Sequence, residues 1–261
     1  MAVESGPPVE LEALSEAAAL TGSGWTVAHF AALGKDRTAE LSPTGFLAQG
    51  EALQDAALRL IAGADQPRLI FASSGAVYGP QGVMPLLVDE PYGHVKGLQE
   101  VALAGWCAAR AIPLTVCRIF NVGGPYGNKL DLYALSSLIR SALSGGNIPI
   151  RAQGAVLRSY VHVEELMAVL VDQARTSVSG RGQPFDSAGT EVVEIGELAA
   201  MACGQLGLDP ACIVRGHDPD APASRYAGDG ADYQAAVRRL GLVPIVIEAI
   251  VSDSIASLSQ R

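Results

Sequence analysis

The stretch RLIFASSGAVYG, residues 68–79, decides the fold class of this sequence. Its first part, residues 68–73, is a short apolar run, which predicts a buried strand. Small and turn-forming residues follow at the point where that strand would end. Ligands bind beyond the carboxyl ends of the strands in an open α/β sheet, so Ser74 is a candidate to hydrogen-bond a substrate oxygen. A serine in such a place is more often a simple turn residue.

Outward from this stretch, strand and helix patterns alternate. Further strands are predicted at residues 25–30, 113–119 and 159–163, and helices at 10–20, 44–62, 92–110, 130–143 and 164–175. This alternation predicts βαβ units and a parallel sheet. After residue 180 the elements shorten, and helices are expected at 193–206, 231–240 and 245–258. We therefore expect an α/β fold, with a parallel sheet flanked by helices in residues 1–180 and a small C-terminal lobe in residues 181–261.

The composition predicts a folded protein with a sizeable core, because 49% of the 261 residues are hydrophobic and 17% are charged. The net charge of −9 gives no electrostatic reason to bind nucleic acid or an anionic membrane. The first residues lack the pattern of a signal peptide, and the longest apolar stretch, residues 243–251, is too short to span a membrane. We expect a cytoplasmic protein.

The cysteines and histidines do not predict a metal site. The cysteines form no CxxC pair and are expected to be small buried residues: Cys107, Cys117, Cys203 and Cys212. The histidines have no ligand spacing: His29, His94, His162 and His217. The sequence therefore predicts no bound metal.

Tyr92 and Lys96 stand four residues apart in the run PYGHVK, at the start of a predicted helix. This spacing places both side chains on one face of the helix. A lysine ammonium beside a phenol favours the phenolate and lowers the pKa of the tyrosine. Such a tyrosine can exchange a proton with a substrate hydroxyl. Chance could also produce this pair, and its position shortly after the Ser74 turn makes the catalytic interpretation stronger.

Four motifs in order carry a resemblance to a known family. They are FASSGAVYG (71–79), PYGHVK (91–96), RIFNVGGPYG (118–127) and RSYVHVEEL (158–166). Their wording, order and spacing resemble the extended short-chain dehydrogenase/reductase family of nucleotide-sugar epimerases and dehydratases. WTVAHFAAL (25–33) is similar to the strand of that family that ends in His-Leu-Ala-Ala. The resemblance implies a Rossmann-type domain that binds NAD or NADP.

The resemblance also implies roles for individual residues. Ser74, Tyr92 and Lys96 match the catalytic triad, in which Tyr92 is the acid/base. The positions that match cofactor contacts are Ala31, Ala32, Ser73, Tyr92, Lys96, Phe120 and Val122. The positions that match substrate contacts are Ser74, Asn121 and Arg158, with Arg215 or Arg225 as a clamp for the pyrophosphate. Each of these arginines could instead be a solvated surface residue.

The sequence departs from the family at its start, which makes the predicted Rossmann domain incomplete. Members of the family open with a strand, a GxxGxxG loop and a helix that hold the cofactor pyrophosphate, and nothing before residue 25 matches this arrangement. We therefore expect weak or absent binding of NAD or NADP. The strand at 25–30 would have a free edge, which we expect residues 1–20, a second copy or a partner chain to cover.

Two function classes remain open. Gly75 and Ala76 stand where sugar 4,6-dehydratases of the family carry an acidic pair, so epimerisation or keto reduction of a nucleotide-sugar-like substrate fits better than dehydration. The alternative is a non-redox enzyme, or a non-catalytic partner subunit, that has lost NAD binding. Members of the family commonly dimerise through the helices that correspond to residues 44–62 and 92–110, so we expect a homodimer.

Overall fold

The computed structural model describes residues 12–14, 16–79, 82–127, 130–178, 183–216, 218 and 220–260. Its main sheet contains four parallel strands, β1 (Thr26–His29), β2 (Arg68–Ser74), β3 (Leu114–Ile119) and β8 (Phe185–Asp186), in the order β1-β2-β3-β8. β2 and β3 lie at the centre and are mostly buried, as apolar strands of a parallel sheet should be. The predicted α/β fold with a parallel sheet is confirmed.

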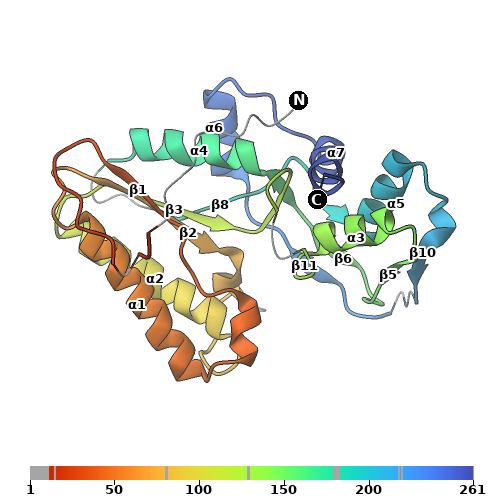
Figure 1. The fold of residues 1–261 in the computed structure, drawn as a ribbon, viewed down its shortest axis with the longest axis horizontal. Helices are drawn as coiled ribbons and strands as arrows, with labels where there is room; N and C mark the ends of the chain where they lie inside the picture. Colours follow the sequence, from red (N-terminus) through yellow and green to blue (C-terminus); the bar gives the residue numbers. More distant parts are fainter. Residues whose placement is uncertain are drawn as a thin grey trace.

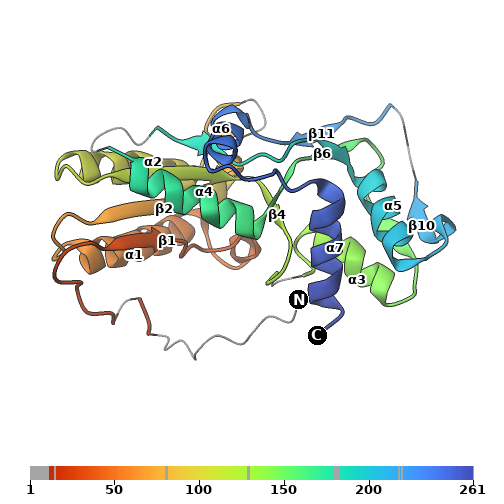
Figure 2. The same ribbon diagram turned by 90° about the horizontal axis from the view of Figure 1, so that it is seen from above.

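Helices cover both faces of this sheet (Figure 1). One face carries α1 (Pro43–Ile61) and α2 (Pro91–Ala108), and the other carries α4 (Val163–Thr176) with α6 (Ala231–Arg239) packed against it. α1 begins where Ser42 accepts a hydrogen bond from the Gly45 amide at 3.1 Å, and Pro43 occupies the first turn. Figure 2 shows the same layers from above.

α1 and α2 approach each other closely at Gly50. A Cβ atom there would lie 2.6 Å from Cγ1 of Val95, so only glycine fits without a shift of that side chain. The Gln99 amide of α2 donates to the Gly50 carbonyl at 3.0 Å. This contact helps to fix the position of α2, the helix that carries Tyr92 and Lys96.

A second lobe lies beyond the carboxyl ends of the main strands (Figure 2). Its helices are α3 (Ala134–Leu143), α5 (Ile195–Leu206) and α7 (Ile247–Leu258), which share one hydrophobic core. Its short strands are β5 (Ile148–Ile150) with β10 (Ile213–Arg215), and β6 (Val156–Arg158) between β9 (Val193–Glu194) and β11 (Ser224–Tyr226). β4 (Asn121–Gly123) and β7 (Tyr160–His162) pair near the junction.

Most predicted elements are present within a few residues of their expected bounds. The exception is the helix expected at 10–20, which is wrong for its described residues. They form only a local turn, in which the amides of Glu16 and Ala17 donate to the Ala13 carbonyl. Leu20 is instead tied to α1 through a 2.7 Å bond to the Leu60 carbonyl. Residues 1–11 and 15, which belong to the expected lead-in and helix, lie outside the described residues.

The division into domains at residue 180 stays a prediction, and the packing crosses that point in both directions. β8 and α6 follow residue 180 and belong to the layers of the main sheet. α3 and β5 precede it and belong to the core of the second lobe. The site between the two parts is therefore built from segments that alternate along the chain.

β1 is an edge strand of the main sheet, as the sequence predicted. Among the described residues it pairs only with β2, in the parallel register that matches Thr26 with Arg68. Trp25 and Phe30 flank it and are exposed by 43% and 42%. What covers this edge stays a prediction. Within the described residues, no helix is both long and apolar enough to cross a membrane.

Candidate active site at the carboxyl ends of the strands

Ser74 is the last residue of β2 and is buried at the carboxyl end of the sheet. Its Oγ accepts a hydrogen bond from the Ala76 amide at 3.2 Å, which caps the 3₁₀ turn η2 (Gly75–Tyr78). The same Oγ lies 3.2 Å from the hydroxyl of Tyr226, on β11 of the second lobe. The side chain is therefore both the turn residue and the candidate site residue that the sequence offered as alternatives.

Tyr92 lies in the first turn of α2, and its side chain is close enough to that of Ser74 for the serine to affect its pKa. Burial raises the pKa of the Tyr92 hydroxyl, while Ser74 opposes that rise and the nearby Tyr133 hydroxyl adds to it. The expectation that Lys96 lowers this pKa is wrong in this structure, because Lys96 does not contribute to the shift. Ser74 and Tyr92 thus meet, with Tyr92 in its protonated form.

Lys96 is buried one turn further along α2 and points at the backbone of β2. Its Nζ donates to the Ala72 carbonyl at 2.7 Å and lies 4.7 Å from the centroid of the Phe71 ring. Burial lowers the pKa of Lys96 to about 8, and the carboxylate of Glu100 opposes that effect. The Lys96 ammonium group is therefore already bound to a backbone carbonyl of β2 and not to the Tyr92 hydroxyl.

His29, at the end of β1, lies in the electrostatic field of Lys96 and also faces the β2 residue Phe71. Its ring stacks on Phe71 with centroids 5.6 Å apart, and its buried Nε2 has no hydrogen-bond partner. Burial, followed by the charge of Lys96, lowers the pKa of His29 to about 4. His29 is therefore neutral at physiological pH. Ala31 and Ala32 follow it in the loop after β1.

The sequence interpretation missed two residues at the site, Lys35 and Tyr226. Lys35 starts the 3₁₀ turn η1 (Lys35–Ala39), and its Nζ lies 5.5 Å from the Tyr92 ring centroid and 5.6 Å from that of Tyr226. The Tyr226 ring packs on Phe120 at 4.7 Å between centroids. The available signals were weak: Lys35 is one of few lysines and follows HFAAL by one glycine, and Tyr226 adjoins Arg225.

A polar network lies directly beneath these residues. Arg118 of β3 binds Glu100 of α2 through two bonds of 2.9 and 2.6 Å, and its Nη1 donates to the Tyr78 hydroxyl at 2.8 Å. Tyr78 in turn donates to Asp186 at 2.9 Å, and Ser73 donates to Glu100. The hydrogen bonds of Glu100 raise the pKa of Arg118 and keep it charged. Ser73 was predicted to contact the cofactor, but in this structure its hydroxyl donates to Glu100 in this network.

The predicted substrate residues are dispersed along the junction between sheet and lobe. The Asn121 amide donates to the Ser159 carbonyl at 2.9 Å and the Tyr226 carbonyl at 3.3 Å, and Val122 is partly exposed. Arg158 donates to the carbonyl and hydroxyl of Ser224, close to exposed Arg225 on the same strand, β11.

Arg215 lies deeper in the second lobe and has protein partners for its guanidinium. It donates to the carbonyls of Ala152 and Gly154 at 3.0 and 2.6 Å, and it forms a 3.0 Å ion pair with Glu194. Glu194 also caps α5, because its carboxylate accepts from the Gly196 amide. This arrangement gives Arg215 a structural role in the lobe.

The profile of the NAD dependent epimerase/dehydratase family matches residues 12–185, well over half of the chain. The chain belongs to this family. The matched region includes the motifs that suggested the resemblance, and the geometry above places three of their residues, Ser74, Tyr92 and Lys96, at one end of the sheet.

Curated relatives in this epimerase/dehydratase family act on nucleotide sugars, according to their names. The chain is similar to a UDP-glucose 4-epimerase of Corynebacterium glutamicum, at 27% identity over 73% of this chain and 63% of the relative. It is similar to a UDP-N-acetyl-alpha-D-glucosaminuronate decarboxylase of Bacillus cytotoxicus, at 28% identity over 67% of this chain and 53% of the relative. The chain therefore spans only about half to two thirds of these curated relatives.

Solved structures of similar fold support the family assignment. MoeE5 in complex with UDP-glucose and NAD is 25% identical, with a TM-score of 0.68 over 90% of this chain and 79% of that one. UDP-N-acetylglucosamine 4-epimerase from Methanobrevibacter ruminantium is 20% identical, with a TM-score of 0.72 over 91% of this chain and 77% of that one. The second of these similarities concerns the fold alone.

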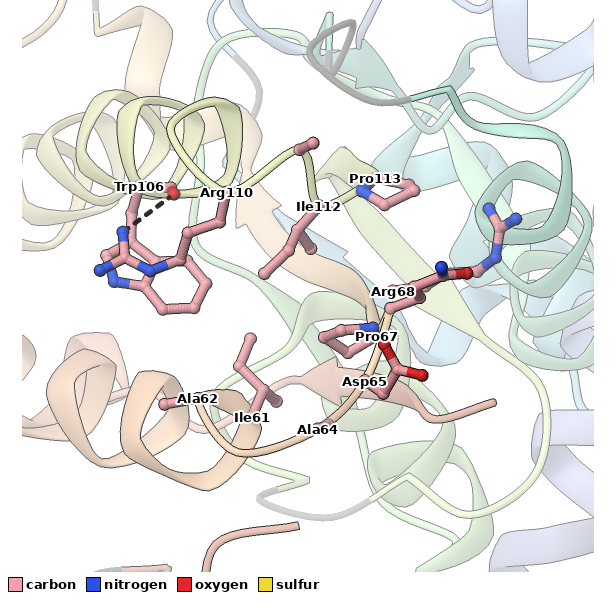
Figure 3. A pocket seen from close by; sticks show the side chains of 12 residues that line it. Ile61, Ala62, Ala64, Asp65, Pro67, Arg68, Trp106, Arg110, Ile112 and Pro113 are labelled. Carbon is pink, nitrogen blue, oxygen red and sulfur yellow. Dashed lines mark hydrogen bonds between the residues drawn. The ribbon is translucent and has the colours of Figure 1, made fainter. Parts of the chain in front are cut away.

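A cavity of about 720 Å³ opens at the other end of the sheet (Figure 3). It lies between the C-terminal ends of α1 and α2, where Arg110 stacks on the Trp106 ring at 4.3 Å. Arg68 contributes to its lining, but its guanidinium points away and binds the Ala174 and Ser177 carbonyls. None of the predicted site residues lines this cavity, so it carries no part of the catalytic proposal. In the described part of the chain, no cluster of three or more metal-ligating side chains exists, and His217 lies outside that part.

The lowered pKa of Lys96 predicts an unusual pH dependence of stability. The folded protein releases this proton at about pH 8 and the unfolded chain at its ordinary value of 10.5, so the unfolded state binds more protons between those values and stability rises with pH. Lys96→Met should remove this gain. Denaturant unfolding should show the stability of the wild type rising by about 2 kcal/mol relative to the variant between pH 7 and pH 9.5. Parallel pH profiles of the two proteins would contradict the assignment.

Proposed function

We propose that this protein catalyses epimerisation or keto reduction of a nucleotide sugar, with Ser74, Tyr92 and Lys96 as its catalytic residues. The observation that carries the proposal is that Ser74 and Tyr92 lie together at the carboxyl end of β2, close enough for Ser74 to affect the pKa of Tyr92. Ligands of open α/β sheets bind at this end. Family membership and the names of the relatives support the substrate class.

Tyr92 is proposed to move the proton of the reaction. Its raised pKa keeps the phenol protonated at neutral pH, which suits donation to a keto oxygen of the sugar. To act as a base, Tyr92 must lose that proton, and the ammonium group of Lys35, 5.5 Å from the Tyr92 ring centroid, is the cation placed to favour the phenolate. Ser74 would hold the same sugar oxygen through its Oγ.

Dehydration is a poorer fit, for a steric as well as a chemical reason. Gly75 and Ala76 carry no carboxylate, which a dehydratase needs next to its catalytic serine. A side chain at Gly75 would also clash with the Phe120 ring, which packs directly over this glycine. An acidic residue there would require Phe120 and its partner Tyr226 to move.

The site fits the nicotinamide half of a dinucleotide better than it fits the adenosine and pyrophosphate half. A bound nicotinamide supplies the hydride acceptor or donor for this chemistry. Tyr92, Lys96, Phe120 and Val122 would hold that half beside β2, where the buried Nε2 of His29 also lacks a partner. The given residues before β1 contain no match to the glycine-rich motif that takes the pyrophosphate in this family. We therefore propose weak cofactor binding for this chain alone.

The arginines of the junction are the proposed contacts for the substrate diphosphate. Arg225 is exposed on β11, and Arg158 lies close enough to bind Ser224 of that strand. A guanidinium group can bind a phosphate through two parallel N–H···O hydrogen bonds. Arg215 becomes the weaker candidate, because its donors already bind Glu194 and two carbonyls. Asn121 would meet the sugar from β4.

The catalytic proposal predicts the effect of removing one hydroxyl. Tyr92→Phe should lower the rate of UDP-sugar epimerisation or reduction by roughly a hundredfold or more, because the proton carrier is lost. The assay follows interconversion of UDP-glucose and UDP-galactose, or reduction of UDP-4-keto sugars, with added NAD or NADPH. Tyr126→Phe, which changes an exposed tyrosine, is the matched control and should keep full activity. An unaffected rate in Tyr92→Phe would exclude the proposed role.

The cofactor proposal predicts weak affinity. Calorimetric titration of the purified chain with NAD and with NADP should give no binding or dissociation constants well above micromolar, because the pyrophosphate lacks its usual loop. A sub-micromolar constant for either dinucleotide would overturn this prediction. Complete absence of binding together with absence of turnover would favour the alternative of a non-redox or partner subunit.

We also propose a homodimer formed through α2. Leu98, Val101 and Ala102 of this helix are exposed, and Val101 is exposed by 73%, whereas Ala56 and Ala57 of α1 are used in the core. Mass measurement at tens of micromolar should give a dimer, and Val101→Glu should shift it to monomer, because a charge would enter the apolar interface. Val83→Glu, at an exposed loop position, is the control. A monomeric wild type would refute the proposal.

A further inference from the structure

Two cysteines of the second lobe lie in sulfur contact. Cys203 is on the buried face of α5 and has no exposed surface. Cys212 ends the 3₁₀ turn η3 (Pro210–Cys212) and is half-buried. Their Sγ atoms are 3.4 Å apart. Both thiols are free, and Cys212 is the partly exposed member of the pair.

The backbone between the two cysteines is held by its own hydrogen bonds. α5 ends at Gly207, whose φ of 67° allows the Leu208 amide to bind back to the Cys203 carbonyl at 2.9 Å. Asp209 then caps η3, and the Cys212 amide donates to the Asp209 carbonyl at 3.0 Å. These bonds hold the two sulfurs 3.4 Å apart, so a disulfide of roughly 2.05 Å would require only a further approach of the two side chains.

We propose that Cys203 and Cys212 form a reversible intramolecular disulfide, a modification site that takes peroxide as its oxidant. The Cys212 thiolate attacks hydrogen peroxide to give a sulfenic acid and hydroxide. The Cys203 sulfur then displaces water from that sulfenic acid, forming the S–S bond, so that two thiols and one peroxide yield one disulfide and two waters. A dithiol reductant reverses the reaction. This proposal is independent of the proposed catalytic function.

The accessibility of the two thiols sets the order of these steps. Burial raises the pKa of Cys203 to about 11, and the neighbouring Cys212 thiol adds to the shift. Cys203 is therefore a poor nucleophile for the reaction with peroxide. It is well placed for the second step, because its sulfur is in contact with that of Cys212. Cys107 and Cys117 lie elsewhere, in α2 and β3, and burial raises the pKa of both thiols.

The disulfide would join α5 to the strand that carries Arg215. β10 follows Cys212 directly, and Arg215 at its end pairs with Glu194, which also accepts a bond from the Val156 amide of β6. β6 in turn pairs with β11, the strand of Tyr226. A bond at Cys212 therefore stiffens the outer end of the framework that presents Tyr226 to Ser74.

The test treats the full chain with a small molar excess of hydrogen peroxide. Peptide mapping without reduction should find Cys203 linked to Cys212, with a loss of two hydrogens. The midpoint temperature of thermal unfolding should rise by roughly 5 °C, as expected when a disulfide closes a short loop. Dithiothreitol should restore the original midpoint. Cys212→Ser should lose both effects, and Cys107→Ala should keep them.

The outcomes that overturn the proposal are equally definite. The proposal fails if peroxide leaves both thiols free to alkylation, converts Cys212 to sulfinic acid without a link, or links it to a second chain. A disulfide without any rise in thermal stability would contradict the stiffening argument. If Cys212→Ser unfolds, Cys212→Ala and mapping of the wild type alone still decide the point.

Discussion

The ion pair between Arg118 and Glu100 is the interaction on which the site depends. It joins β3 to α2 through two hydrogen bonds beneath the carboxyl ends of the strands. Glu100 is buried and Arg118 is partly buried, so removing either partner would leave the other charge without its ion pair. Glu100 also accepts a hydrogen bond from Ser73. Arg118 donates to Tyr78, which in turn donates to Asp186. It therefore sets the position of α2 relative to the sheet, and with it the position of Tyr92 and Lys96.

The same burial that builds this framework opposes ionisation of Tyr92, which its proposed role as a base would require. The Tyr92 phenol lies beside Ser74 and loses solvation by burial, and its pKa rises; burial also raises the pKa of the neighbouring Tyr226. Lys96 is also buried, and its pKa falls to about 8, so it holds its proton less tightly than an exposed lysine does. A charged ligand that displaces Tyr226 or draws Lys35 closer would change both balances.

The sequence predicted the central fold well because its signals were local. Apolar runs predicted β2 and β3, and the four-residue spacing of Tyr92 and Lys96 predicted their shared helix face, which the structure confirms. The segment before β1 was misjudged because helix-forming residues without a packing surface do not stabilise a helix, and Leu20 instead binds the end of α1. β8 contains two residues and gave no periodic signal, so its place in the main sheet was missed.

The missed site residues, Lys35 and Tyr226, share a physical cause. Each lies on a short element whose position depends on contacts with residues distant in the sequence. Local spacing of residues does not predict such long-range contacts. Tyr226 is placed by β11, which exists only because β6 pairs with it. Gly228 then passes so close to Asp186 and Phe120 that any side chain there would clash with both. The second lobe is thus attached to the ion-pair network through Asp186, whose carboxylate accepts from the Asp229 amide at 3.0 Å. A change in the network of Arg118 should therefore displace Tyr226 as well as Tyr92, although the two tyrosines lie far apart in the sequence.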